Sequence, residues 1–549
     1  RSGLTTSQLS YLSTAQINAM NGAHISRLST DSVKALSSDQ VAAINVTALR
    51  SLNADQINAI DTGDLVAMGT AQVAALRSDQ LQGMTTDKLN VLTTTQVAAL
   101  SASQLGSLAT DQVANLKTDT IATLSSEQVS GLKVQQLDAL DTSQISKIAS
   151  SAIAGLSGTQ IARLATDQLA ALTTGQTQAL SNTQIRALTT SQMAGLSTAS
   201  LEALTTAQVD FLSASQLNAL SGTQIASLQT ADVAQLDAKI ISALSTDTVS
   251  ALTSGQVKAL DSTQVQSLTT SQLNSMAVDI VAALDTNQIQ ALTTTQVKNF
   301  ANASLTALTT SQVQALTTAQ VSALTTDQIT NLSTSQIAAI NTEQASVLSV
   351  AQLNAMGSDQ IQAIETADVA ALTSTQMAGL SSANVAVLTS DQVKSLGSSQ
   401  LQAMSTTQLN ALDTADVAVL LTSQVQALTT AQISAVSTSV LTALTTSQVQ
   451  ALTTSQVSSL TNTQVSNLTT AQVEALTSDQ FRAMTGGQIA SLTTDQLAAL
   501  ETSDLANMTT GQISELTTGF IQALSTAQVA ALTTAQASAL TVAQLNAMG

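Results

Sequence analysis

The stretch LTTSQVQALTTSQVSSLTNTQVSNL, residues 444–468, returns a leucine every eight residues. The same spacing runs outward in both directions, from Leu4 to Met548, and gives 68 complete octads with no insertion or deletion. We number the leucine as position one. Position six is apolar in nearly every octad, position two is mostly Thr, Ser, Asp or Asn, position five is Gln in 49 octads and position eight is usually Ala. Self-similarity at a fixed period is typical of repeat architectures.

A period of eight fits neither a continuous helix nor a strand. At 3.6 residues per turn, eight residues advance about 800°, so the leucine stripe would drift by roughly 80° per octad. Positions one and six have opposite parity, and one strand therefore cannot place both on the same face. Each octad must form its own short element.

The residues between the leucines follow the rules of helix capping. Thr or Ser at position two is a preferred N-cap, and Gln at position five completes the capping box Thr-x-x-Gln. Asp recurs at position four, where an acid favours the helix dipole, and positions one and six are the two ends of a hydrophobic staple. The pattern predicts one helix of about six or seven residues per octad.

Helices this short are unstable alone and must stack on their neighbours. We therefore predict an all-α repeat solenoid, an elongated superhelical rod in which residues 1–549 form a single continuous array, Leu4 to Ala547, without an internal boundary. The number of octads per coil stays open; three would give a rod on the order of 200 Å, at about 10 Å between packed layers. A β-solenoid is the alternative, because Thr and Val favour strands.

Composition excludes several classes of protein. The chain has a net charge of −19 with only 9% charged residues, so it lacks the basic clusters that bind nucleic acid or anionic membranes. Its longest apolar runs are too short to span a bilayer. It has no Cys, which excludes disulfides and thiol chemistry. The chain opens with Arg1, from which we expect a processed or excised segment.

Few residues are candidates for chemistry. His24 stands at position five, and we interpret it as a surface cap because no second His or Cys exists to share a site. Two acid pairs, Asp61 with Asp64 and Asp368 with Glu365, could act as general acid and base, but their positions favour capping. Stacked Asp31 and Asp39 could bind Ca²⁺, although the aspartate series is interrupted.

Other departures indicate that the octad pattern tolerates substitution at several positions. The glycines of MTGGQIAS, starting at Met484, are in register and lack the spacing of a phosphate loop. Ile240, Ile280, Val440 and Phe520 replace Gln at position five and could mark lateral contact spots or neutral drift. We predict that the chain is not an enzyme and has no catalytic residue, no cofactor and no metal.

The motif LTTAQVAAL, as in LTTDQLAAL from Leu492 and LSTAQVAAL from Leu524, resembles octapeptide-repeat regions of very large secreted, adhesin-like exoproteins of Gram-negative bacteria. The resemblance implies secretion and an extracellular or cell-surface location. It carries no catalytic residue.

Two functions follow as hypotheses. The first is a structural filament, stalk or matrix layer that self-associates, head to tail or laterally, because function usually resides on loops and this array has no inserted loops. The second is an adhesin, in which the rod displays a ligand surface or a distal domain to cell-surface or matrix partners.

Overall fold

The computed structural model describes residues 4–549 and contains 68 short α-helices over that range, from α1 (Thr6–Ser10) to α68 (Val542–Ala547). No strand occurs in the described residues, so the all-α repeat solenoid is confirmed and the β-solenoid alternative is wrong. Every helix begins at position three of its octad. Most helices end at position eight and have six residues. Helices of five residues, which end at position seven, are α1, α2, α4, α10, α12, α14, α15, α16, α17, α21, α25, α31, α32, α35, α37, α38, α42, α43, α55, α59, α61, α62 and α66. Helices of four residues, which end at position six, are α3, α6, α11, α19, α26, α27, α48 and α51.

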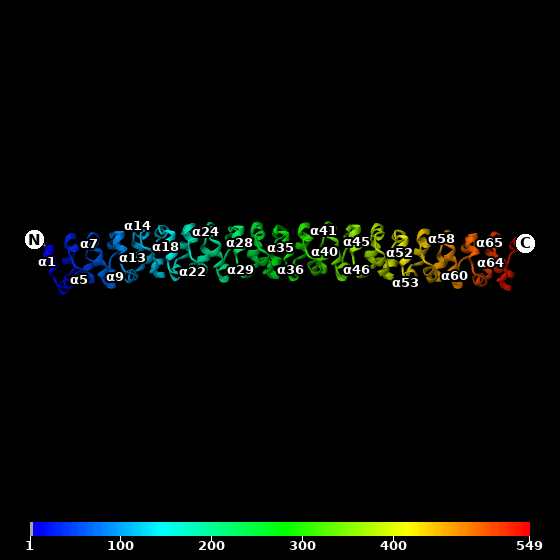
Figure 1. Ribbon diagram of the computed structural model, residues 1–549, viewed down its shortest axis with the longest axis horizontal. Coiled ribbons are helices and arrows are strands. Elements are labelled where there is room, and N and C mark those ends of the chain that lie inside the picture. The colour runs from blue at the N-terminus through cyan, green and yellow to red at the C-terminus, as the bar shows by residue number, and fades with distance from the viewer. Residues whose placement is uncertain (1–3) are drawn as a thin grey trace. The chain divides into compact units, whose positions relative to one another are not determined.

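The chain divides into two compact units, Arg1–Leu284 and Asp285–Gly549. In Figure 1 the first unit runs from blue to green and the second from green to red, and within each unit the short helices follow one another around successive coils. The octad register continues through residue 284 in the sequence. The single array over residues 1–549 remains a prediction.

Each coil contains three octads, the number that the sequence left open. Helices pack against the helix three places further along the chain: α5 (Ser38–Ala43) contacts α8 (Thr62–Ala67), and α47 (Ser374–Gly379) contacts α50 (Ser398–Ala403). Three successive helices therefore complete one coil before the pattern of contacts repeats. Within each unit, most helices contact the helices three places before and after them, which is the arrangement of a solenoid.

The bends between helices use extended backbone. After α40 (Thr318–Ala323), Leu324 has φ −57° and ψ 137°, and the next residue, Thr325, has φ −76° and ψ 160°. No described residue has a positive φ, which explains why the bends need no glycine. The helices have four to six residues instead of the expected six or seven. The six-residue helices end at position eight because the leucine that follows is extended, as Leu324 is.

The core is built from positions one and six. Leu316 and Val321 are 5% and 1% exposed, and the same two positions are buried in nearly every interior octad. Position eight meets position three of an octad in the preceding coil at close range: a Cβ added to Gly379 would lie 2.7 Å from both γ-methyl groups of Val350. The small residue at position eight therefore permits the approach of adjacent coils, as the pattern predicts.

Candidate functional site

The most constrained polar group in the structure is the glutamine at position five. In α40, the backbone N–H of Thr317 donates to Gln320 Oε1 at 2.7 Å, and the N–H of Gln320 donates to Thr317 Oγ1 at 3.2 Å. These two bonds form the predicted capping box. Gln320 is nevertheless only 1% exposed, so it lies between coils and not on the surface.

The other end of this amide binds the preceding coil. Gln320 Nε2 donates to the carbonyls of Ile289 at 2.8 Å and Leu292 at 2.6 Å, which are 31 and 28 residues earlier. Both carbonyls lie at the C-terminal end of α36 (Thr286–Ala291), where helix carbonyls lack the usual N–H partner four residues ahead. The Ile289 carbonyl also accepts the N–H of Leu292 at 3.2 Å. One glutamine therefore starts a helix in its own coil and completes a helix in the coil before it.

The same ladder of glutamines runs through both units. In the first unit, Gln176 Nε2 donates to Ile145 and Ile148 at 2.8 and 2.7 Å, and Gln80 Nε2 donates to Leu49 and Leu52 at 3.0 and 2.7 Å. The amide has one acceptor oxygen and two donor hydrogens, and all three are used. A buried polar group with every partner satisfied stabilises the coil and fixes its register.

Sequence reasoning missed this second role, although a signal for it exists. A capping box accepts Glu as well as Gln, yet none of the 68 octads has Glu at position five. Glutamate can replace the amide oxygen but has no hydrogens to donate. Its absence, beside 49 glutamines, indicates that a group that also donates is favoured at this position. Lys88 shows the same demand, since its ammonium donates to the carbonyl of Ile60 in the preceding coil.

Aspartate at position five makes a different contact. Asp64 Oδ1 accepts the hydroxyl of Ser38 at 2.6 Å, and Asp416 and Asp504 accept the hydroxyls of Ser390 and Ser478 at 2.9 and 3.1 Å. The side chain of Asp232 forms the equivalent hydrogen bond with Thr206. Burial raises the pKa of the Asp416 and Asp504 carboxyls.

Two further buried aspartates have fewer partners. Asp232 is 1% exposed and its Oδ2 makes no hydrogen bond, and burial raises the pKa of this carboxyl. Burial, together with the charge of Glu365, raises the pKa of Asp368 to about 6. An ionised carboxylate at this position can only accept hydrogen bonds, whereas the glutamine amide that it replaces also donates them.

The two acid pairs do not cap helices as expected. Asp61 and Glu365 occupy N-cap positions, but neither side chain accepts a cap hydrogen bond. Their partners Asp64 and Asp368 are buried at position five. The capping interpretation is therefore wrong for these side chains, because it did not anticipate that position five faces the preceding coil. Within residues 4–549, no three His, Cys, Asp or Glu side chains lie together as metal ligands would.

The remaining candidates resolve individually. His24 is exposed, and its Nδ1 accepts the N–H of Asn21 at 3.4 Å, so it acts as the predicted surface cap. Asp31 and Asp39 are exposed in the first turns of their helices. Gly486 and Gly487 of MTGGQIAS lie in an ordinary capped helix, α61 (Gly486–Ala490).

The apolar departures at position five are buried or half-buried. Phe520 is 3% exposed, and Ile240, Ile280 and Val440 are half-buried. Burial excludes Phe520 as an exposed lateral contact, whereas lateral contact at Ile240, Ile280 and Val440 stays a prediction. They are further cases in which position five packs against the neighbouring coil.

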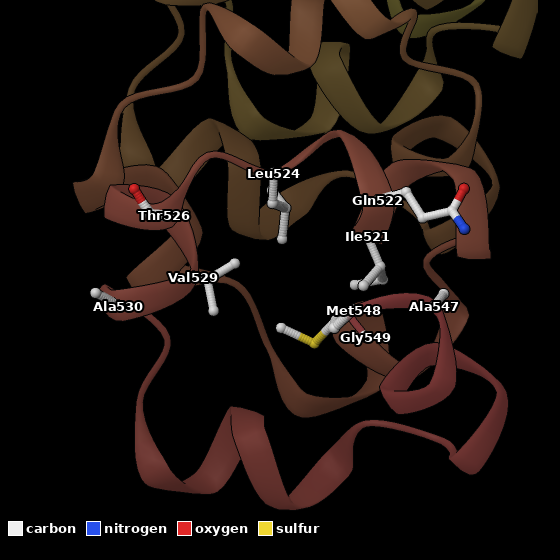
Figure 2. A pocket seen from close by; sticks show the side chains of 9 residues that line it. All are labelled: Ile521, Gln522, Leu524, Thr526, Val529, Ala530, Ala547, Met548 and Gly549. Carbon is white, nitrogen blue, oxygen red and sulfur yellow. The ribbon is translucent and has the colours of Figure 1, made fainter.

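A hollow of about 540 Å³ opens beside the last described coil. Figure 2 shows Ile521, Leu524, Val529 and Met548 directed into it. Leu524 and Val529 are half-buried there, whereas Leu500, at the equivalent position one coil before Leu524, is 5% exposed. The hollow therefore presents the same apolar positions that a following coil covers elsewhere in the unit.

The chain is similar to one described family. The family described as "ALTTAQ repeat" matches residues 57–94, 161–198, 185–222, 225–262, 300–334, 361–398, 393–430, 462–494 and 497–534. No curated protein matches the chain. Two solved structures, titled "Structure of APUM23-GGAAUUGACGG" and "Structure of APUM23-GGAGUUGACGG", are 11% and 12% identical, cover 91% and 93% of this chain and 94% and 92% of their own, and have TM-scores of 0.15 and 0.16. These scores are too low to carry an argument.

The length of the described helices also bears on whether the chain could span a membrane. None of the helices within residues 4–549 has the length and apolar character needed to cross a bilayer.

Proposed function

Because the chain belongs to the ALTTAQ repeat family, we propose that it is a structural protein, which forms an extracellular or cell-surface filament, stalk or matrix layer. The glutamine ladder is the observation that supports this role. Within each unit, successive coils are joined by buried side-chain bonds such as those from Gln320 to Ile289 and Leu292. A scaffold requires this kind of uniform connection, repeated along the chain.

The ladder also explains how such a scaffold would resist extension. Pulling two coils apart must break the amide bonds of position five and expose the apolar positions one and six together. Because the same kind of bond recurs along each unit, the resistance is distributed over many coils. No single weak joint is needed for the chain to work as a support.

Self-association is the second part of the proposal. The uniform apolar pattern supports it, because a coil from a second copy carries the same side chains at positions one and six that pack between coils within each unit. Such a contact joins different surfaces on the two copies, and a contact of that kind extends into a fibre.

Force spectroscopy and electron microscopy of the purified chain test the structural role. Each coil of three octads that detaches should lengthen the chain by roughly 80 Å, at about 3.5 Å per residue, so we expect a series of steps in multiples of this value. Images should show particles on the order of 200 Å long, at about 10 Å per coil. Extension without steps, or compact particles, would contradict the scaffold role.

Sedimentation velocity tests self-association, and immunogold labelling of the source cells tests location. Val529→Lys places a charge in the hollow and should abolish assembly, whereas Ser514→Lys adds the same charge at an exposed position and should leave assembly intact. An unmodified chain that stays monomeric at high concentration argues against the self-association proposal. Label confined to the cell interior argues against a surface role.

A further inference from the structure

Asparagine at position seven is correlated with the residue at position five of the octad four places ahead. Eight octads have Asn at position seven, and in seven of these the octad four places ahead lies within the chain. In all seven, that position five has lost its glutamine, although chance would give about two, since only 19 of 68 octads lack Gln. The seven pairs are Asn18/Ala48, Asn58/Lys88, Asn90/Thr120, Asn218/Thr248, Asn274/Ser304, Asn354/Asn384 and Asn410/Val440.

The contacts of Asn218 explain the correlation. Asn218 Oδ1 accepts the N–H of Ser245 at 2.8 Å and the hydroxyl of Thr248 at 2.9 Å, and its Nδ2 donates to the carbonyl of Ala243 at 3.2 Å. Ser245 is the N-cap of α31 (Thr246–Ser250). In other octads this N-cap N–H donates to the position-five glutamine. Here an asparagine from the preceding coil takes the place of the glutamine oxygen.

The same bond recurs in four other pairs. The N-cap N–H groups of Thr85, Lys117, Ser381 and Ser437 donate to the Oδ1 atoms of Asn58, Asn90, Asn354 and Asn410 at 3.2, 2.9, 2.7 and 2.7 Å. Asn90 and Asn354 also donate from Nδ2 to the carbonyls of Asn115 and Gly379, at 2.7 and 2.9 Å. The asparagine thus holds both sides of the bend before the helix.

In two pairs, different residues carry the two roles of the glutamine, which are to donate to the preceding coil and to accept the N-cap N–H. Lys88 keeps the donor role, since its Nζ donates to the carbonyl of Ile60, but an ammonium has no lone pair for the N-cap N–H. Asn384 also keeps one donor bond, to the carbonyl of Leu353 at 3.0 Å, but it is one methylene shorter than glutamine. In both octads the missing acceptor is supplied by the paired asparagine of the preceding coil, Asn58 or Asn354.

The pair Asn18/Ala48 follows the sequence correlation with different bonds. There the N-cap is itself an asparagine, Asn45, and its Nδ2 donates to the carbonyls of Asn18 and Met20 at 2.8 Å each. The link between coils is kept, with the donor on the later coil.

We propose that asparagine at position seven is a second cross-coil clamp, which binds the N-cap of the helix four octads ahead in octads whose position five has lost its glutamine. The clamp positions the bend before that helix and replaces a bond that would otherwise be lost between two coils. This inference concerns how the chain folds, and it stands whether or not the chain assembles into a filament.

Hydrogen–deuterium exchange of the full chain tests the proposal with a rescue series. Asn218→Ala should raise the exchange rate of α31 by roughly tenfold, because the N-cap N–H and the Ala243 carbonyl both lose a partner. Thr248→Gln introduced into that variant should return exchange to the original rate, because the glutamine supplies its own acceptor. Asn218 is exposed, so its substitution leaves the core unchanged.

The matched control is Ala234→Asn. It adds an asparagine at position seven, four octads before the octad of Gln264, whose Oε1 already accepts the N–H of Asp261 at 2.8 Å. Exchange in α33 (Ser262–Ser267) should therefore not change. The proposal is overturned if Asn218→Ala leaves α31 unaffected, if Thr248→Gln does not restore the rate, or if Ala234→Asn protects α33 as strongly as Asn218 protects α31.

Discussion

Gln320 Nε2 donates to the carbonyl of Leu292 at 2.6 Å, across 28 residues of sequence. The same side chain accepts the N–H of Thr317 at its oxygen, three residues away. A local capping signal and a long-range link between coils therefore reside in one amide. Because the longer bond spans one coil of three octads plus half an octad, it also sets which octads stack on one another.

The threonine of the capping box should make a modest contribution of its own to the free energy of unfolding. Thr317→Ala removes the hydroxyl that accepts the N–H of Gln320, and we expect a loss of about 1 kcal/mol in unfolding free energy. Thr318→Ala, at the first helical residue, is the control and should have a smaller effect. Urea unfolding followed by circular dichroism measures both; equal losses would argue against the cap.

Close approach at position eight should make some glycines irreplaceable. In Gly379→Ala the new Cβ would lie 2.7 Å from two methyl carbons of Val350, and we expect destabilisation of about 1–3 kcal/mol from overpacking. Gly63→Ala adds a methyl group with no atom within 4 Å, and should stabilise the chain by about 0.5–1 kcal/mol through helix propensity. Thermal unfolding of both variants compares them; a stabilising Gly379→Ala would contradict the observed packing.

Asp368 should make stability depend on pH between about 4 and 6. Its pKa is raised from 3.8 to about 6 in the folded chain, because burial and Glu365 disfavour the charged form. The folded state therefore binds this proton more tightly than the unfolded state. The resulting stability is fully present below pH 3.8, and is lost as pH rises through 6, by roughly 2–3 kcal/mol.

Asp368→Gln should remove this pH dependence and raise stability at pH 7, because the amide can donate to the carbonyls of Ile337 and Ile340 as other glutamines at this position do. Asp359→Asn, which neutralises an exposed aspartate, is the control and should leave the dependence intact. Urea unfolding at pH 4, 5, 6 and 7 measures it. An unchanged pH profile in Asp368→Gln would contradict the assignment.

Much of the local structure could be predicted from the octad alone. The N-cap at Thr317 and its capping box with Gln320 depend only on residues within one octad. The apolar pattern of the octad also predicts which side chains, such as Leu316 and Val321, the neighbouring coils bury. The helix type and the positions of the bends therefore follow directly from the pattern.

The coil size and the second role of glutamine depend on contacts between octads. Every octad offers nearly the same surface, so one octad does not indicate which other octad it meets. The correlation between Asn218 and Thr248 does carry this information, because their separation exceeds one coil of three octads by less than one octad. For the same reason, the sequence of one octad does not predict that Asp64 and Asp368 are buried against the preceding coil.

The most direct test of the central claim is hydrogen–deuterium exchange of Gln320→Glu. Glutamate keeps the oxygen that accepts the N–H of Thr317, but loses both hydrogens that reach the carbonyls of Ile289 and Leu292 at the end of α36. We predict faster exchange in α36 as well as in α40, and no change in Gln314→Glu, the same substitution at an exposed position. Faster exchange confined to α40, or no difference between the two variants, would contradict the claim that glutamine joins one coil to the next.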